Sequence, residues 1–172
     1  MYGVVDFYRA AKKCGVKPII GCEVYCAART RFDREGGTDR EHNHLVLLCE
    51  NNRGYENLCK LVSLSWTEGF YGKPRVDFEL LERYHEGLIA LSACLAGEIP
   101  RALSVGDYDE AKAAALRYRE IFGEDNFYLE LQALAGDRDP ARRHQRRPLP
   151  RARGCRNAPC AALHPDQPHR RR

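Results

Sequence analysis

The chain has 172 residues and a formal net charge of +4, which is enough length for one domain with a real hydrophobic core. It contains no run of about 18 apolar residues, so no membrane-spanning helix is expected, and its first residues, MYGVVDFYRAAKKCG, lack the pattern of a secretory signal peptide. The eight cysteines are therefore expected to be mostly reduced thiols of a cytoplasmic protein, not a disulfide framework.

The charge divides the chain into two unlike parts. Residues 133–172 contain 11 Arg and 3 Asp but no Lys or Glu, a net of +8, which leaves 17 basic and 21 acidic residues, a net of −4, in residues 1–132. The second part also lacks Ile, Val, Phe, Tyr, Ser and Thr, and its prolines interrupt any regular period. We expect one folded domain in residues 1–132. Residues 133–172 are interpreted as a disordered tail from an out-of-frame, GC-rich reading, or alternatively as a basic arm that binds nucleic acid.

Strands and helices are predicted to alternate along residues 1–132. Helical spacing of apolar residues follows the polar caps Asp77 and Asp107, and predicted helices end at Gly15, Gly87 and Gly123. Short apolar runs predict strands between the helices. The elements expected, in chain order, are a helix at 4–15, a strand at Ile19–Tyr25, a polar loop at 28–43, a strand at His44–Cys49, helices at 51–69 and 77–87, a strand at Leu88–Ala93, a helix at 107–123 and a strand at Phe127–Leu131.

This alternation predicts an α/β fold with a parallel sheet. The stretch His44–Cys49 is almost continuously apolar, which is typical of a parallel strand covered on both faces. Four strands, with a leading helix that has no strand before it, do not close a common barrel or doubly wound sheet. We therefore expect the chain to be incomplete at its front.

Three residues of metal-ligand type lie in or beside predicted strands: Glu23, His44 and Cys94. At the carboxyl ends of parallel strands, a carboxylate, an imidazole and a thiolate can converge on one ion. Glu23 interrupts the apolar run KPIIGCEVYC and is expected to be buried, where an unpaired charge costs several kcal/mol. Taken singly, each has a simpler interpretation: a Glu paired with Arg, a satisfied His, or a Cys packed as a small hydrophobe.

Other candidate residues predict less chemistry. Cys22 and Cys26 alternate onto the strand face opposite Glu23, about 13 Å apart in an extended strand, so core packing is expected of them and not a shared ion. His42 shares a face with His44 but lies at the edge of the loop. The sequence has no Gly-rich phosphate loop and no nucleophile elbow.

The chain resembles the N-terminal PHP domain (polymerase and histidinol phosphatase) of bacterial DNA polymerase III alpha subunits over residues 1–132. The motifs that carry the resemblance are GCEVY, KPRVD and LSACLAGEIP, which occur in family order. It implies an incomplete PHP-type distorted (β/α)7 barrel, in a family that holds divalent ions, zinc or manganese, at the barrel mouth. It also implies that Glu23, His44 and Cys94 are metal ligands, so that an ion would offset the charge of Glu23.

Two departures from the family pattern limit this expectation. The family's H-x-H strand and D-H-G turn would precede Met1, and its N-D-x-H strand would follow Gln132, where the arginine-rich part begins. Because only three of the family's ligands remain, metal binding by this chain is expected to be weak or absent, and no catalytic residue is assigned.

The favoured hypothesis is a truncated piece of the PHP domain of a DNA polymerase III alpha subunit. The intact parent would perform template-directed DNA synthesis in the cytoplasm, with DNA, a proofreading exonuclease subunit and the sliding clamp as partners and no membrane. Its PHP domain would be a metal-binding module with possible 3′–5′ exonuclease activity. Two alternatives stay open: a free-standing phosphoesterase of the histidinol-phosphatase type, and a non-catalytic basic protein that binds nucleic acid.

Overall fold

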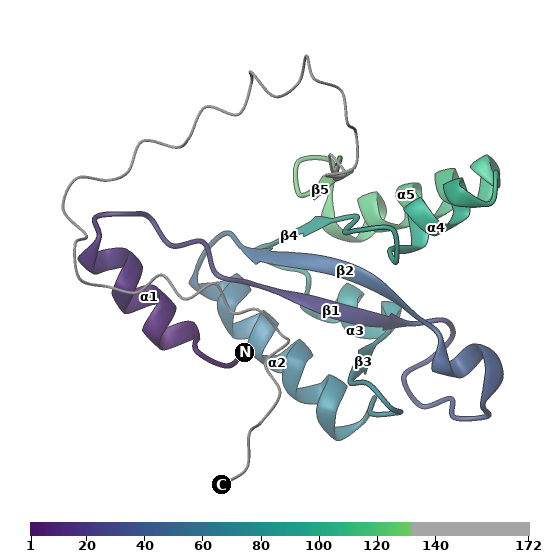
Figure 1. Cartoon of the computed structure of the whole chain (residues 1–172), viewed down its shortest axis with the longest axis horizontal. Helices are drawn as coiled ribbons and strands as arrows, with labels where there is room; N and C mark the ends of the chain where they lie inside the picture. Colours follow the sequence, from purple (N-terminus) through teal and green to yellow (C-terminus); the bar gives the residue numbers. More distant parts are fainter. Residues whose placement is uncertain (132–172) are drawn as a thin grey trace, which may run out of the picture.

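One mixed sheet organises the chain, whose structure is a computed structural model that describes residues 1–131 (Figure 1). Its strands lie in the order β3–β1–β2–β4–β5. They are β1 (Gly21–Ala27), β2 (His42–Cys49), β3 (Arg75–Val76), β4 (Leu88–Leu91) and β5 (Phe127–Tyr128). The helices are α1 (Val4–Lys13), α2 (Asn52–Thr67), α3 (Phe78–Tyr84), α4 (Glu98–Ser104) and α5 (Tyr108–Phe122), with a 3-10 turn, η1 (Gly37–Arg40), between β1 and β2.

The order and type of the predicted elements are confirmed, with differences at their ends. Helices α1, α2, α3 and α5 occupy the predicted ranges, β1 starts later than predicted, and β4 and β5 are shorter. The short elements β3, α4 and η1 were not predicted. Their sequences carry little signal, because β3 has two residues and α4 has seven, with Pro100 in its first turn.

The prediction of a wholly parallel sheet is wrong. β2 runs antiparallel to both of its neighbours, β1 and β4, whereas the pairs β1–β3 and β4–β5 are parallel. A parallel connection needs a crossover, usually a helix, and the segment between β1 and β2 contains only the short turn η1. The chain therefore folds back beside β1. The apolar run of β2 reflects a strand whose Leu45 and Leu47 are buried on one face, while its other face is partly covered.

Polar caps begin two of the helices as predicted. The backbone N–H of Leu80 donates to Asp77 Oδ1 at 3.1 Å, and the N–H of Glu110 donates to Asp107 Oδ1 at 3.0 Å. Asp77 has a second role, because its carboxylate also accepts hydrogen bonds from the backbone N–H and the guanidinium of Arg31 at 3.0 Å. The start of α3 is thus joined to the loop that follows β1.

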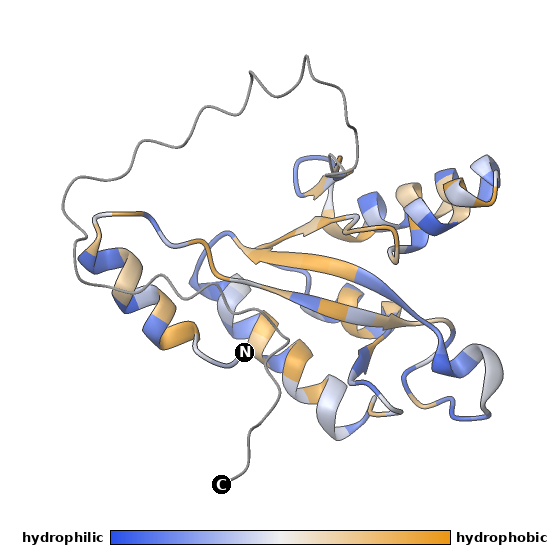
Figure 2. Ribbon diagram, viewed as in Figure 1, coloured by the Kyte–Doolittle hydropathy of each residue, from blue (hydrophilic) through white to orange (hydrophobic). Residues whose placement is uncertain are grey.

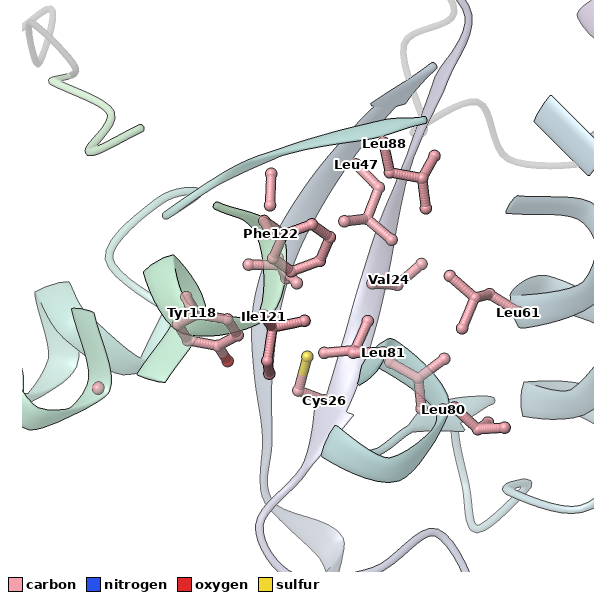
Figure 3. Packing of buried hydrophobic residues seen from close by; sticks show 14 of the residues in the cluster. Val24, Cys26, Leu47, Leu61, Leu80, Leu81, Leu88, Tyr118, Ile121 and Phe122 are labelled. Carbon is pink, nitrogen blue, oxygen red and sulfur yellow. The ribbon is translucent and has the colours of Figure 1, made fainter. Parts of the chain in front are cut away.

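The hydrophobic core lies between one face of the sheet and the helices (Figure 3). Alternate residues of β1 and β2 point into it, and α2, α3 and α5 provide the opposing side chains. Cys26 is buried there, and Cys22 packs against the edge of the core, as expected for residues on the face opposite Glu23. The labelled members of the cluster are Val24, Cys26, Leu47, Leu61, Leu80, Leu81, Leu88, Tyr118, Ile121 and Phe122.

The connection between β1 and β2, residues 28–41, is held by one buried arginine. The guanidinium of Arg75 donates to the carbonyl oxygens of Asp39 at 2.6 Å, Asp33 at 2.9 Å, Arg31 at 3.1 Å and Gly69 at 3.1 Å. Burial lowers the pKa of Arg75, although the backbone carbonyls satisfy its donors. A long polar loop therefore has a fixed path beside the end of the sheet.

Hydrophobic residues concentrate along β2 and β4, and the loops around them are mostly hydrophilic (Figure 2). Within residues 1–131, no helix is both long and apolar enough to cross a membrane. The predicted tail, residues 133–172, lies outside the described residues.

Candidate functional site

Glu23 and His44 meet on the sheet face opposite the core. The register of β1 and β2 pairs Tyr25 with His44 and Glu23 with Val46, so Glu23 and His44 are diagonal neighbours on one face. His44 Nδ1 lies 3.1 Å from Glu23 Oε1. The antiparallel pairing therefore provides the contact, although a parallel sheet had been predicted to do so.

Cys94 reaches the same histidine from the turn that follows β4. The pairing of Val46 with Leu91 places the end of β4 beside the start of β2, and Cys94 Sγ lies 3.6 Å from His44 Nδ1. The turn itself is tightly specified, because Ala93 adopts a positive φ of 60°. The backbone N–H of His44 donates to the carbonyl of Ala96 at 3.0 Å, which joins this turn to β2.

Gly97 is a further residue that the turn requires. Its N–H donates to the Cys94 carbonyl at 2.8 Å, and a Cβ at this position would collide with the carbonyl oxygen of Ser92. Any larger residue would therefore shift the backbone that aims Cys94 at His44. Sequence reasoning did not single out Ala93 or Gly97; the only signal was the Gly in LSACLAGEIP, which reads equally well as an ordinary turn residue.

The expected burial of Glu23 is wrong. Its side chain is 46% exposed, because the face of β1 that carries it is not covered by a helix. The carboxylate is therefore in contact with solvent, and the fold needs no bound ion to offset its charge. The apolar residues around Glu23 in the sequence belong to the other face of the strand, where Val24 and Cys26 are buried.

Aromatic side chains surround His44 on the same face. The ring centroid of Tyr25 lies 4.6 Å from that of His42 and 5.1 Å from that of His44, and the two imidazoles stack at 5.8 Å. The ammonium group of Lys73 lies 5.4 Å from the centroid of the Tyr25 ring. His42, expected at the loop edge, is thus part of a continuous cluster with the candidate ligands.

The three predicted ligands fit a borderline divalent ion in their donor types, but the described residues do not complete a site. Zinc–ligand distances of about 2.0 Å to N or O and about 2.3 Å to S would place the ligand atoms of a tetrahedral site roughly 3.3–3.6 Å apart. The two contacts of His44 Nδ1, at 3.1 and 3.6 Å, are near this range. Nevertheless, no group of three or more His, Cys, Asp or Glu side chains among residues 1–131 is arranged to hold an ion. The Glu23 carboxylate and the Cys94 thiol both approach the same nitrogen, His44 Nδ1. This geometry is that of hydrogen bonds and not of three ligands around an ion.

Comparison with known proteins identifies the family to which the chain is similar. A family model described as the PHP domain matches residues 1–134. The DNA polymerase III subunit alpha of Borreliella burgdorferi is 47% identical over 133 residues, which cover 77% of this chain and 12% of that protein. The same subunit of Deinococcus radiodurans is 48% identical over 136 residues, covering 77% of the chain and 10% of the relative. That of Thermus aquaticus is 47% identical over 134 residues, covering 77% and 11%.

The chain spans only about a tenth of the length of these relatives, so their names describe much larger proteins. The matched residues nevertheless include the whole described sheet and the segments that carry Glu23, His44 and Cys94. Because the family model covers most of the sequence, the chain belongs to the PHP domain family.

Proposed function

We propose that this chain is part of the metal-binding PHP module of a DNA polymerase III alpha subunit, with Glu23, His44 and Cys94 as three of its metal ligands. The observation that carries the proposal is the contact of one imidazole nitrogen with both a carboxylate and a thiol. Membership of the PHP family supports it, since PHP domains are in general metal-binding. The parent subunit would act in template-directed DNA synthesis.

The mixture of donors favours zinc or manganese as the ion. A thiolate and an imidazole suit zinc, whereas a carboxylate suits manganese, so the set lies between the two preferences. When bound, such an ion would activate water for attack on a phosphodiester, as a 3′–5′ exonuclease requires. The chain's own residues would orient the ion, and the turn that contains Gly97 would hold Cys94 in reach of it.

The partners of the parent are also part of this proposal. Binding of DNA, of a proofreading exonuclease subunit and of a sliding clamp would belong to the whole subunit, in the cytoplasm. This chain alone spans 12% or less of the matched subunits, and we expect neither polymerase nor phosphoesterase activity from it. Its own contribution is proposed to be a weak, partial metal site.

Zinc titration of the 172-residue chain, in competition with a chromogenic chelator, tests the proposed ligands. Wild type should bind zinc weakly, and His44→Ala should remove the component of binding that depends on the site, because both contacts converge on its Nδ1. His85→Ala is the matched control, since that imidazole lies at the end of α3, where its Nδ1 is 2.7 Å from the Glu82 carbonyl oxygen. Other potential donors, including Cys155 and Cys160, are unchanged in both variants.

Two results would contradict the proposal in different ways. Equal zinc affinity of wild type and His44→Ala would show that the candidate ligands are not ligands. A stoichiometric ion that survives purification and chelator in the wild type would show that the site is complete, against the expectation of weak binding.

A further inference from the structure

We propose that Arg40 and Lys73 form a phosphate-binding rim beside Glu23, His44 and Cys94, and that this rim holds a phosphate group of the substrate. The inference rests on the proposed function for the identity of the neighbouring site. It concerns residues that are not themselves candidate ligands, and it can be tested without any metal.

Lys73 is placed at the rim by a tight turn and a fixed strand. Gly72 has a positive φ of 71°, and the N–H of Tyr71 donates to the Lys73 carbonyl at 3.0 Å, which closes the turn. β3 follows at Arg75, whose backbone pairs with Tyr25 in β1 and whose guanidinium is buried. The backbone of Lys73 is therefore held in place by the turn before it and by β3 after it.

Arg40 approaches the same place from the loop between β1 and β2. It ends η1 just before β2, and its carbonyl contacts His42 Nδ1 at 3.2 Å. Its guanidinium lies 5.9 Å from the centroid of the Tyr71 ring, and Tyr71 is in the turn that carries Lys73. The loop is fixed from beneath by the hydrogen bond of Arg75 to the Asp39 carbonyl. The backbone segments that carry Arg40 and Lys73 are thus fixed next to the aromatic cluster of Tyr25, His42 and His44.

Among the described residues, neither cation is neutralised by an ion pair. Within residues 1–131, no carboxylate lies within salt-bridge distance of Arg40 or Lys73, whereas Arg101, on the α4 side of β2, is paired with Glu41 at 3.3 Å. A cation–π contact uses none of the N–H donors of the ammonium or guanidinium group. Two sets of donors therefore remain available for an anion.

A phosphate is the anion that this chemistry fits. A guanidinium presents a planar fork to phosphate oxygens and an ammonium acts as a point charge, and the two together match a group of two negative charges. Glu23 would repel an anion on the same face, but its carboxylate lies 3.1 Å from His44 Nδ1, whereas the Lys73 ammonium lies beside the Tyr25 ring. A phosphate on the rim would be held one side chain away from the candidate ligands.

The test is titration of the 172-residue chain with thymidine 5′-monophosphate, inorganic phosphate and thymidine, in excess chelator. NMR signals of the Tyr25 and His42 rings report binding at the rim specifically. We expect both phosphate-containing probes to shift them, and Lys73→Gln or Arg40→Gln to weaken that binding by about three- to ten-fold each. Lys112→Gln and Arg9→Gln remove equal charges from exposed positions of α5 and α1 and should leave the affinity unchanged.

Similar affinities of thymidine and its monophosphate would overturn the proposal, because the phosphate would then contribute nothing. Equal weakening by the rim variants and by their controls would also overturn it, since net charge alone would explain the effect. Zinc binding is measured separately, so loss of metal binding in His44→Ala with no phosphate binding would refute the rim and leave the proposed function intact. Phosphate binding at the rim with no effect of His44→Ala on zinc affinity would support the rim and refute the proposed metal ligands.

Discussion

The two faces of one sheet have different roles, although the same strands build both. On the core face, side chains are buried against α2, α3 and α5, and Leu47 is fully buried. The opposite face is partly or fully exposed except near the end of β1, where Ala27 is buried, and it carries the candidate site. Its residues are Glu23, Tyr25, His44, Val46, Leu48, Ile89 and Leu91.

Because of this difference, adjacent residues of one strand contribute either to the stability of the fold or to the candidate site. Because side chains alternate along a strand, Val24 and Leu45 support the fold while their neighbours Glu23 and His44 face the site. Substitutions one position apart should therefore affect different properties. The following predictions test that separation, beginning with the largest expected effect.

Leu47→Ala should lower the free energy of unfolding by about 2–5 kcal/mol, because it leaves a cavity in a fully buried position. Val46→Ala, one residue earlier on the partly exposed face, should cost about 1 kcal/mol or less. Urea unfolding followed by circular dichroism measures both. Equal losses from the two substitutions would mean that the second face is covered as fully as the first.

The buried thiol of Cys26 should make stability depend on pH in the alkaline range. Burial raises the pKa of Cys26 from 9.0 to about 12, so the unfolded state loses this proton before the folded state does. Stability from the neutral thiol is complete below about pH 9 and declines as the pH rises toward 12, by at most about 1.4 kcal/mol per pH unit.

Urea unfolding of wild type and Cys26→Ala between pH 8 and pH 11 isolates this contribution. The variant should show a smaller decline than wild type, whereas Cys14→Ala, at an exposed position in the residues after α1, should follow wild type. Parallel curves for wild type and Cys26→Ala would rule out the buried thiol as the cause.

Glu23→Gln should change the free energy of unfolding least, by about 0.5 kcal/mol or less, because exposed ion pairs contribute little. Zinc affinity should fall in the same variant if the carboxylate is a ligand. Glu86→Gln provides the comparison, since Glu86 is an exposed residue that pairs with Arg53 far from the site. A large loss of stability in Glu23→Gln with unchanged zinc affinity would assign Glu23 to the fold and not to the chemistry.

The sequence predicted the elements of the fold better than their arrangement. Local patterns determine where a helix starts, as Asp77 and Asp107 do, and the described structure confirms both caps. The direction of β2 depends on how the loop at 28–41 returns, and that path is determined by Arg75, whose partners are 6 to 44 residues away in sequence. No local pattern contains this information.

The sequence selected candidate residues for the site but did not predict their geometry. Residue type and the family resemblance selected Glu23, His44 and Cys94, and the structure brings His44 into contact with the other two. The burial of Glu23 was misjudged, because the apolar neighbours in GCEVYC suggest a covered strand on both faces. The rim residues Arg40 and Lys73 were missed, since an exposed cation in a polar loop looks the same in sequence whether or not an aromatic ring lies beneath it.

The four carbonyl hydrogen bonds of Arg75 also have a consequence for proteolysis. Residues 28–41 form a polar surface loop with four arginines, the kind of segment that trypsin usually cuts first. Cleavage requires the backbone to enter the protease in an extended conformation, and here three of the loop's carbonyls are held from the inside by one buried guanidinium. The loop should therefore resist trypsin for as long as the sheet stays folded, and its cleavage would report on opening of the β1–β3 edge.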